Sequence, residues 1–118
     1  MLQEFFLGFM KIHILYHASQ ERVYGAWLLQ ELARHGYRLG PSTLYPALHS
    51  LERKGYLECS QEVVAGKVRK YYLATAKGRE ALAEARLRAQ ELVAEVLEQG
   101  DERAGGDMAA NSQESHRR

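Results

Sequence analysis

The sequence predicts a mainly α-helical domain that carries one small β-hairpin. Apolar residues recur at helical spacing in three segments before residue 55 and in one segment after residue 75. Between them lie two short runs of β-compatible residues, 56–62 and 68–74, joined by a glycine-containing connection. The 118 residues leave room for one main core, because single domains commonly hold about 100 to 200 residues.

Charge and cysteine content limit the possible functions. The formal net charge of +1 predicts no partner, but residues 1–78 contain ten Lys and Arg against six Asp and Glu, a balance of +4, and residues 79–118 have a balance of −3. An anionic partner is therefore expected to bind the N-terminal part. Cys59 is the only cysteine, which excludes an intrachain disulfide and a Cys-based zinc finger. No segment is apolar enough for a membrane span, and we expect a cytoplasmic protein.

Residues 5–16 predict a helix that is apolar around its whole axis. Two rows of large apolar residues run along different sides: Phe5, Phe9, Ile12 and Tyr16 form one row, and Phe6, Met10 and Ile14 the other. Such a helix has to be buried from two directions. A small domain rarely buries both sides of its first helix, so we expect a partner subunit to cover the second one.

Residues 25–35 predict a second helix, which ends before Gly36 in the left-handed conformation. Its inward-facing residues are expected to be Leu28, Leu29 and Leu32.

A third helix is predicted to begin at Ser42 or Thr43 and to end at Gly55. Pro46 lacks an N–H group and is tolerated in the first turn of a helix, which places the start just before it. The leucines at i, i+4 and i+7 form a buried stripe, and the opposite face carries polar and aromatic residues: Leu44, Leu48 and Leu51 on the first, Tyr45, His49 and Arg53 on the second.

The two β-compatible runs predict a hairpin with a basic tip. The connection contains Ala65, Gly66 and Lys67. Arg69 and Lys70 follow in the second strand, and period-2 alternation sends them to opposite faces. They could not both contact one flat ligand.

A last helix is predicted over residues 76–99, with Thr75 as its cap. Its apolar residues have spacings of 3, 4, 3 and 4, namely Leu82, Ala85, Ala89, Leu92 and Val96. This is the pattern of a coiled-coil seam, held for about two heptads, and we expect a dimerisation helix. Residues 100–118 have no periodicity and few large apolar residues, which predicts a disordered tail.

The order of elements over residues 1–75 is that of a winged helix-turn-helix domain, in which the third helix enters the major groove of DNA and the hairpin touches the backbone. The motif Thr-Leu-Tyr-Pro-x-Leu-x-x-Leu-Glu-x-x-Gly at 43–55, with Arg-Lys-Tyr-Tyr at 69–72, closely resembles the PadR family of bacterial transcriptional regulators. The resemblance covers roughly residues 8–98. The short C-terminus is similar to the family's small subgroup, which has a single C-terminal helix.

The resemblance implies a homodimeric repressor that a small molecule releases from its operator. The dimer would be held by the first and last helices, through Phe5, Phe9, Ile12, Leu82, Ala85, Ala89, Leu92 and Val96. An apolar or aromatic effector would bind at the dimer axis, in a cleft lined by residues such as Phe5, Phe9, Ile12 and Val93. No aromatic residue follows Tyr72, so stacking against a C-terminal tryptophan is not carried over, and the only tryptophan is Trp27.

The expected DNA contacts come from the third helix and the hairpin: Ser42, Thr43, Tyr45, His49, Arg53, Lys67, Arg69 and Lys70. Ser42 and Thr43 suit phosphate contacts, and Tyr45 and His49 would reach base edges or adjacent phosphates. The alternative is a solvated helix face and a hairpin whose charges only discourage strand pairing. For the hairpin, the choice between Arg69 and Lys70 stays open.

His13 and His17 lie at i and i+4, the spacing of a possible metal pair. Two ligands do not make a structural zinc site, and no cysteine or carboxylate near them completes it, so a pair of interface histidines is the preferred interpretation. Cys59 is expected to be a small buried residue that shares the inward face of its strand with Leu57. No metal or cofactor is expected.

The sequence therefore predicts a sequence-specific DNA-binding regulator, namely a ligand-responsive repressor that binds a palindromic operator as a homodimer. The alternative is a winged-helix module for protein–protein contact, whose affinity for DNA would be weak and independent of sequence. An enzyme is not expected, because no Ser/His/Asp set, carboxylate pair or glycine-rich phosphate loop can be assembled.

Overall fold

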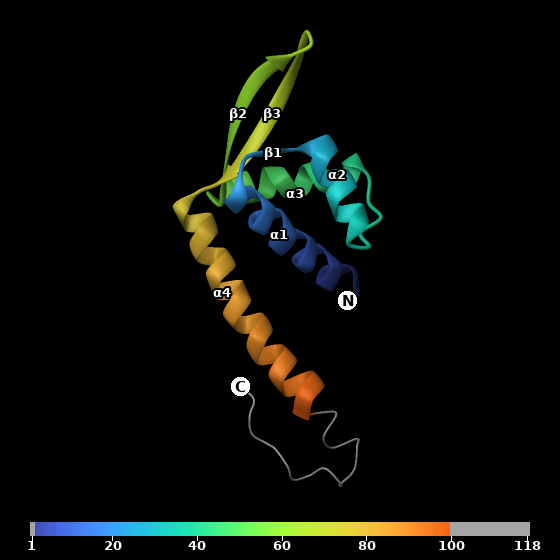
Figure 1. Ribbon diagram of the computed structural model, residues 1–118, viewed down its shortest axis with the longest axis vertical. Helices are drawn as coiled ribbons and strands as arrows, with labels where there is room; N and C mark the ends of the chain where they lie inside the picture. The colour runs from blue at the N-terminus through green and yellow to red at the C-terminus, as the bar shows by residue number, and fades with distance from the viewer. Residues whose placement is uncertain (1, 100–118) are drawn as a thin grey trace. The chain divides into compact units, whose positions relative to one another are not determined.

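The computed structural model describes residues 2–99, and the predicted tail at 100–118 lies outside them. The elements are α1 (Leu2–Gln20), β1 (Val23–Tyr24), α2 (Gly25–Arg34), α3 (Pro41–Arg53), β2 (Leu57–Val64), β3 (Lys67–Ala74), α4 (Ala76–Val93) and a π-helical segment (Ala94–Gln99) (Figure 1). The mainly helical fold with a small sheet is confirmed. The described residues divide into two units, with the boundary between Leu82 and Ala83. None of the helices in the described range is both long and apolar enough to cross a membrane.

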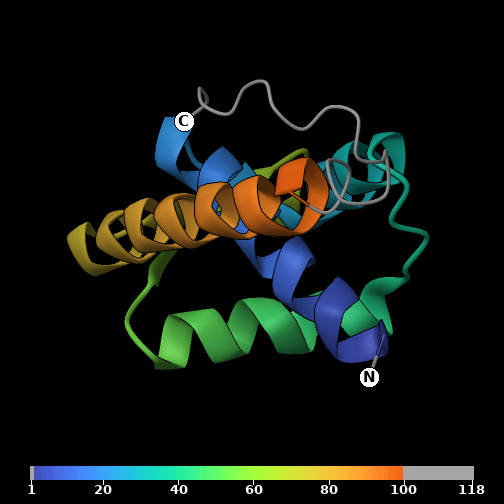
Figure 2. The same ribbon diagram turned by 90° about the horizontal axis from the view of Figure 1, so that it is seen from below.

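Helix α1 is longer than predicted and has one buried and one exposed apolar side. Met10, Ile14, Leu15 and Ala18 are buried in the core of the first unit. Phe5 and Phe9, in the other predicted row, expose 49% and 50% of their surface. Phe6 exposes 58% although Met10 and Ile14 of its predicted row are buried. Seen from below, α2 and α3 lie on either side of α1 (Figure 2). The prediction that the protomer covers only part of this helix is confirmed.

Helices α2 and α3 end in the same hydrogen-bonded motif. After α2, the N–H of Tyr37 donates to the carbonyl of Leu32 and the N–H of Gly36 to that of Ala33, both at 3.0 Å. Gly36 has a φ of +91° and Gly55, at the same place after α3, a φ of +86°, a conformation that favours glycine. Both glycine stops predicted from the sequence are confirmed.

The predicted start of α3 at Ser42 or Thr43 is wrong. The helix begins at Pro41, with Gly40 as its cap, and the carbonyl of Gly40 accepts the N–H groups of Thr43 and Leu44 at 3.1 Å. Pro41 takes the first helical position, where its missing N–H has no partner to lose. Pro46 therefore lies inside the helix and cannot donate to the carbonyl of Ser42.

The hairpin is closed by a two-residue turn, and the sheet contains a third strand. Ala65 and Gly66 have φ of 53° and 80°, as in a type I′ turn, so Lys67 already pairs with Val64. Strand β1 pairs antiparallel with β3, which gives the order β1-β3-β2. Strand β1 was not predicted from the sequence.

The core of the first unit lies between the three helices and the inner face of the sheet. The stripe of α3 is confirmed, since Leu44, Leu48 and Leu51 are buried. Leu28 and Leu32 of α2 are buried too, and Leu29 is partly buried against them. The largest fully buried side chain is Tyr72 of β3. Cys59 is partly buried and packs against this core, as expected.

A joint of short hydrogen bonds links the end of α3 to the start of α4. The hydroxyl of Thr75 donates to the carbonyl of Gly55 at 2.6 Å and accepts the N–H of Gly78 at 3.0 Å, so Thr75 caps α4 as predicted. The N–H of Thr75 donates to the carbonyl of Tyr56 at 3.1 Å. Gly78 lies so close to that carbonyl that a Cβ there would collide with it. This contact explains why glycine stands where a capping box would have Glu or Gln.

The residues of the predicted α4 seam become more exposed from Leu82 towards Val96. Leu82 is only 4% exposed and belongs to the core of its own protomer, so it has little surface left for a partner. Ala85 is half-buried, Ala89 is exposed, and Leu92 and Val96 each expose 56% of their surface. Val96 falls in the π-helical segment, where the spacing of the seam is no longer that of an α-helix.

Candidate nucleic-acid interface

A groove of about 670 Å³ lies between the start of α2, one residue of α3 and the hairpin. Its lining consists of Tyr24, Gly25, Ala26, Tyr45, Val64, Ala65, Lys67, Val68, Arg69 and Lys70. The groove brings together one predicted contact from the recognition helix and the three predicted from the hairpin. Arg69 and Lys70 both border it, because a concave surface can be lined by neighbouring strand residues that a flat ligand could not contact together.

Tyr45 forms the α3 side of the groove. Its ring packs against Gly25 at the start of α2, and a Cβ at residue 25 would lie 2.7 Å from its Cζ atom. The side chain is nevertheless 38% exposed. Tyr45 is thus fixed in position by contact with α2 while part of its ring stays available to a ligand.

Two arginines lie over tyrosine rings on the outer face of the sheet. The guanidinium of Arg69 is 4.0 Å from the ring centre of Tyr24, and that of Arg22 is 3.9 Å from the ring centre of Tyr71. Arg22 also donates a hydrogen bond of 2.6 Å to Glu62. Hydrogen bonding to Tyr71 raises the pKa of Arg69. These contacts hold Arg69 in its position at the edge of the groove.

The start of α2 contributes to the groove and was missed by the sequence analysis. Its cap residue Tyr24 makes no side-chain hydrogen bond to the helix, so no such bond competes for the first N–H groups of α2. Helix N-termini attract anions through these groups and the helix dipole. The β-compatible pair Val23-Tyr24 just before a predicted helix was the one available signal.

The other predicted contacts lie along α3 and outside the lining of the groove. Ser42, His49 and Arg53 are exposed, and Thr43 is half-buried on the first turn. Thr43 borders a second hollow of about 300 Å³ instead, which it shares with Phe6 and Met10 of α1.

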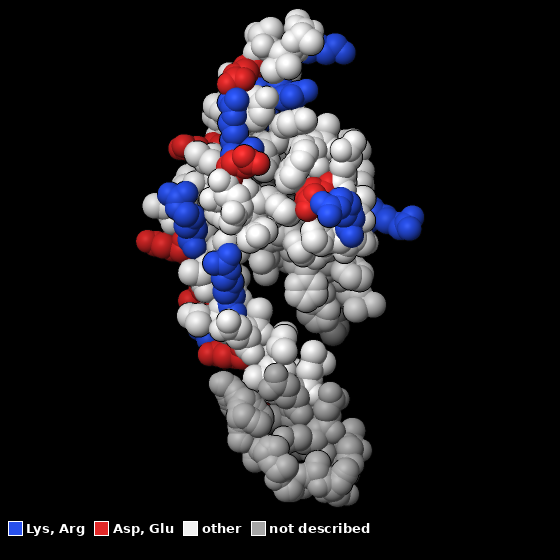
Figure 3. Space-filling view, viewed as in Figure 1, with Lys and Arg blue, Asp and Glu red and all other residues white. Residues whose placement is uncertain are grey.

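Charged residues follow the hairpin to its tip. On the face shown in Figure 3, Lys and Arg side chains are distributed along the hairpin, with acidic side chains between them. Lys67, the first residue of β3, is exposed beside the turn.

The residues predicted to bind an effector are found on two different helices. Phe5 and Phe9 are exposed on α1, Ile12 is half-buried on the same helix, and Val93, the last residue of α4, exposes 45% of its surface.

Comparison with known proteins places this architecture in a family. Residues 14–84 match the family described as "Transcriptional regulator PadR-like family". The chain is 52% identical over 96 residues to "Transcriptional regulator Rv3488" of Mycobacterium tuberculosis, which covers 81% of this chain and 90% of that protein.

Two solved structures give the same result. The chain is similar to a PadR family transcriptional regulator from Eggerthella lenta, with a TM-score of 0.73 and 32% identity over 81% of this chain and 85% of the other. It is also similar to a PadR-like transcriptional regulator from Bacillus cereus, with a TM-score of 0.66 and 30% identity over 85% and 95%. The chain therefore belongs to the PadR-like family of transcriptional regulators, DNA-binding proteins that are not enzymes.

Proposed function

We propose that the protein is a ligand-responsive repressor that binds a palindromic operator as a homodimer. The observation that carries the proposal is the groove, which combines the cations of the hairpin with Tyr45 and the uncapped start of α2. A DNA backbone that follows this groove would meet Lys67, Arg69 and the N–H groups of α2. Phosphate contacts of this kind position a protein on DNA, while base contacts specify the site.

The base contacts that recognise the operator sequence would come from α3. Its buried leucine stripe fixes the helix on the core, so that Tyr45 and His49 are exposed on the other side, one turn apart. In a winged helix-turn-helix this helix lies in the major groove. A two-fold symmetric dimer would present two such helices, which calls for half-sites about 10 bp apart or a multiple of that.

The exposed apolar sides of α1 and α4 support the homodimer. Phe5, Phe6 and Phe9 are about half exposed on α1, and Leu92 and Val96 on α4. Exposed apolar surface of this extent is typical of an interaction site. We propose that a second copy covers these surfaces, and that an apolar effector binds beside Phe5, Phe9, Ile12 and Val93.

Leu92→Asp tests the dimer. A charge at an interface that excludes water costs several kcal/mol, so light scattering of this variant is expected to show monomer or aggregate. Gln90→Asp, which introduces the same charge at an exposed position of α4 outside the predicted seam, is the matched control. A Leu92→Asp dimer of unchanged stability would exclude α4 from the interface.

The DNA-binding function is tested by titration against two duplexes. The first contains the upstream region of the protein's own gene, and the second is a shuffled duplex of the same length. We expect tighter binding to the first, with a logarithmic affinity that falls linearly with the logarithm of salt concentration. Equal and weak binding to both duplexes would favour a protein–protein module and contradict the proposal.

A further inference from the structure

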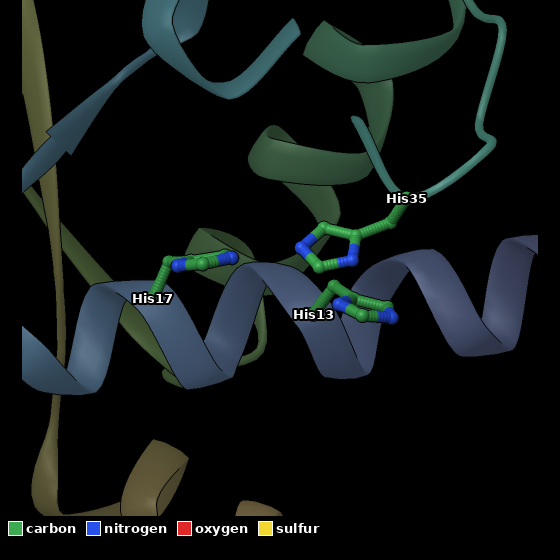
Figure 4. Close-up of side chains that lie close together, drawn as sticks. All are labelled: His13, His17 and His35. Carbon is green, nitrogen blue, oxygen red and sulfur yellow. The ribbon is translucent and has the colours of Figure 1, made fainter. Parts of the chain in front are cut away.

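Three histidines from two elements meet on one side of α1 (Figure 4). His13 and His17 lie one turn apart on α1, and His35 is the residue that ends α2. One ring nitrogen of each histidine lies within 4.8 Å of those of the other two. The sequence analysis considered only the pair on α1, because His35 is distant along the chain.

A carboxylate completes the cluster. The Oε2 atom of Glu31 lies 3.6 Å from Nε2 of His17 and 3.3 Å from Nε2 of His35. Its other oxygen accepts a hydrogen bond of 2.8 Å from Arg34. Only 13% of the Glu31 side chain is exposed. Arg34 therefore orients the carboxylate so that one oxygen faces the histidines.

The Nε2 atom of His17 is a buried polar atom without a hydrogen-bond partner among the described residues. It is buried and makes no hydrogen bond within the described residues, since its distance to Glu31 exceeds hydrogen-bonding range. A buried polar atom without a partner costs about 1–3 kcal/mol. A bound ligand at this nitrogen would remove that cost.

The surroundings favour neutral imidazole rings. His17 and Trp27 pack in a T-shaped arrangement with ring centres 5.3 Å apart, and His13 and Tyr37 do so with ring centres 5.2 Å apart. Burial lowers the pKa of both His13 and His17 below the ordinary value. The neutral ring, which has a free lone pair, is the form that binds a metal ion.

We propose that His13, His17 and His35, with Glu31 as the fourth ligand, bind one divalent transition-metal ion, for which zinc is the reference. Imidazole and carboxylate groups are common zinc ligands, whereas calcium and magnesium prefer sites made of oxygen atoms alone. Around a tetrahedral ion with bonds of about 2.0–2.1 Å, ligand atoms are about 3.4 Å apart. The nitrogens, within 4.8 Å of one another, need only a small contraction. The His35 side chain, 43% exposed, has the freedom to make it.

The test uses the untagged full chain after removal of metal by a chelator. Calorimetric titration with Zn²⁺ is expected to give one ion per chain. His17→Ala and His35→Ala should each weaken binding by about 100-fold or more, because each removes a direct ligand and even indirect supporting contacts account for about 10–100-fold. His49→Ala, on the exposed face of α3, is the matched control and should bind as the parent chain does.

Two further measurements keep the proposal falsifiable. Zn²⁺ should raise the melting temperature of the parent chain and of His49→Ala but not that of His35→Ala, whose exposed side chain can be removed without loss of the fold. Co²⁺ should give the strong visible absorption of a tetrahedral site and quench the single residue Trp27, which contacts His17. Binding weaker than millimolar, or binding that His17→Ala and His35→Ala leave unchanged, would overturn the proposal. None of these results depends on DNA binding.

Discussion

Two regions of the first unit pack aromatic rings against side chains that can carry a positive charge. On the outer face of the sheet, Arg22 and Arg69 lie over the faces of tyrosine rings. Beside α1, His13 and His17 pack against Tyr37 and Trp27 in T-shaped arrangements. Both regions combine an aromatic ring with a basic side chain, but the arginines remain charged whereas the pKa of each of the two histidines is lowered.

The difference comes from the charged group and from its burial. A guanidinium stays charged and is attracted to the negative face of an aromatic ring, so the two arginines remain cations on the exposed sheet. An imidazole can lose its proton, and burial favours its neutral form. The first region is consistent with the proposed phosphate contacts, and the second with the proposed metal site.

Removal of a tyrosine ring from the sheet should have the largest effect. Tyr71 is 9% exposed, beneath Arg22, and Tyr71→Ala is expected to lower the free energy of unfolding by about 3 kcal/mol, since large aromatic truncations in cores cost about 3–5 kcal/mol. Urea unfolding followed by circular dichroism measures the loss. Tyr71→Phe keeps the ring and should lose less than about 1 kcal/mol, and Trp27→Ala, at a half-buried site beside the histidines, should lose less than Tyr71→Ala. The reverse order would mean that the histidine region is the better packed of the two.

The next effect concerns DNA binding at Tyr45. Tyr45→Ala should weaken operator binding by about 1–3 kcal/mol, with a smaller loss on random duplex, because base contacts carry the specificity. Fluorescence anisotropy on both duplexes at one salt concentration measures the two losses. Gly25→Ala should displace the same ring without removing it and weaken operator binding in the same direction. Equal losses on the two duplexes would reduce Tyr45 to a backbone contact.

A smaller effect is expected from a single cation of the hairpin. Lys67→Ala should weaken binding to all sequences about equally and reduce the salt slope by about one unit, the effect of one lost phosphate contact. Arg34→Ala removes another exposed cation, beside the histidine cluster, and should leave the slope unchanged. A loss confined to one operator would contradict a phosphate contact at Lys67.

The smallest effect is a dependence of stability on pH at the Arg22–Glu62 pair. The hydrogen bond from Arg22 holds the pKa of Glu62 below its ordinary value of 4.5. A carboxyl whose pKa is lower in the folded state stabilises the fold above the unfolded pKa, and this contribution is lost as the pH falls through the folded value. Glu62→Gln should thus lower the melting temperature slightly at pH 7, and the difference should shrink as the pH falls below 4.5. A difference that persists in acid would assign the effect to packing instead of charge.

Local patterns in the sequence were enough for most of the elements. The buried stripe of α3, the glycine stops at residues 36 and 55 and the cap at Thr75 all depend on residues within one or two turns of each other. The start of α3 was misjudged because Pro46 was assigned to the first turn, whereas Pro41 takes that place and Pro46 lies inside the helix.

Contacts between distant segments could not be predicted. Strand β1 has two residues and becomes a strand only through its pairing with β3. That pairing places Tyr24 and the neighbouring Arg22 over the outer face of the sheet, so Tyr71 is buried there while Tyr72 is buried in the core. His35 joins His13 and His17 for the same reason, since the end of α2 folds back onto α1.

The hydrogen-bonded joint connects the C-terminal end of α3 to the first turn of α4. Thr75 bonds the carbonyl of Gly55, Lys77 bonds that of Lys54 at 2.8 Å, and Gly78 rests against Tyr56. These contacts tie the first turn of α4 to the C-terminal end of α3, so neither can rotate alone without breaking a hydrogen bond. A substitution at Thr75 or Gly78 would therefore displace the end of α3 as well as the start of α4.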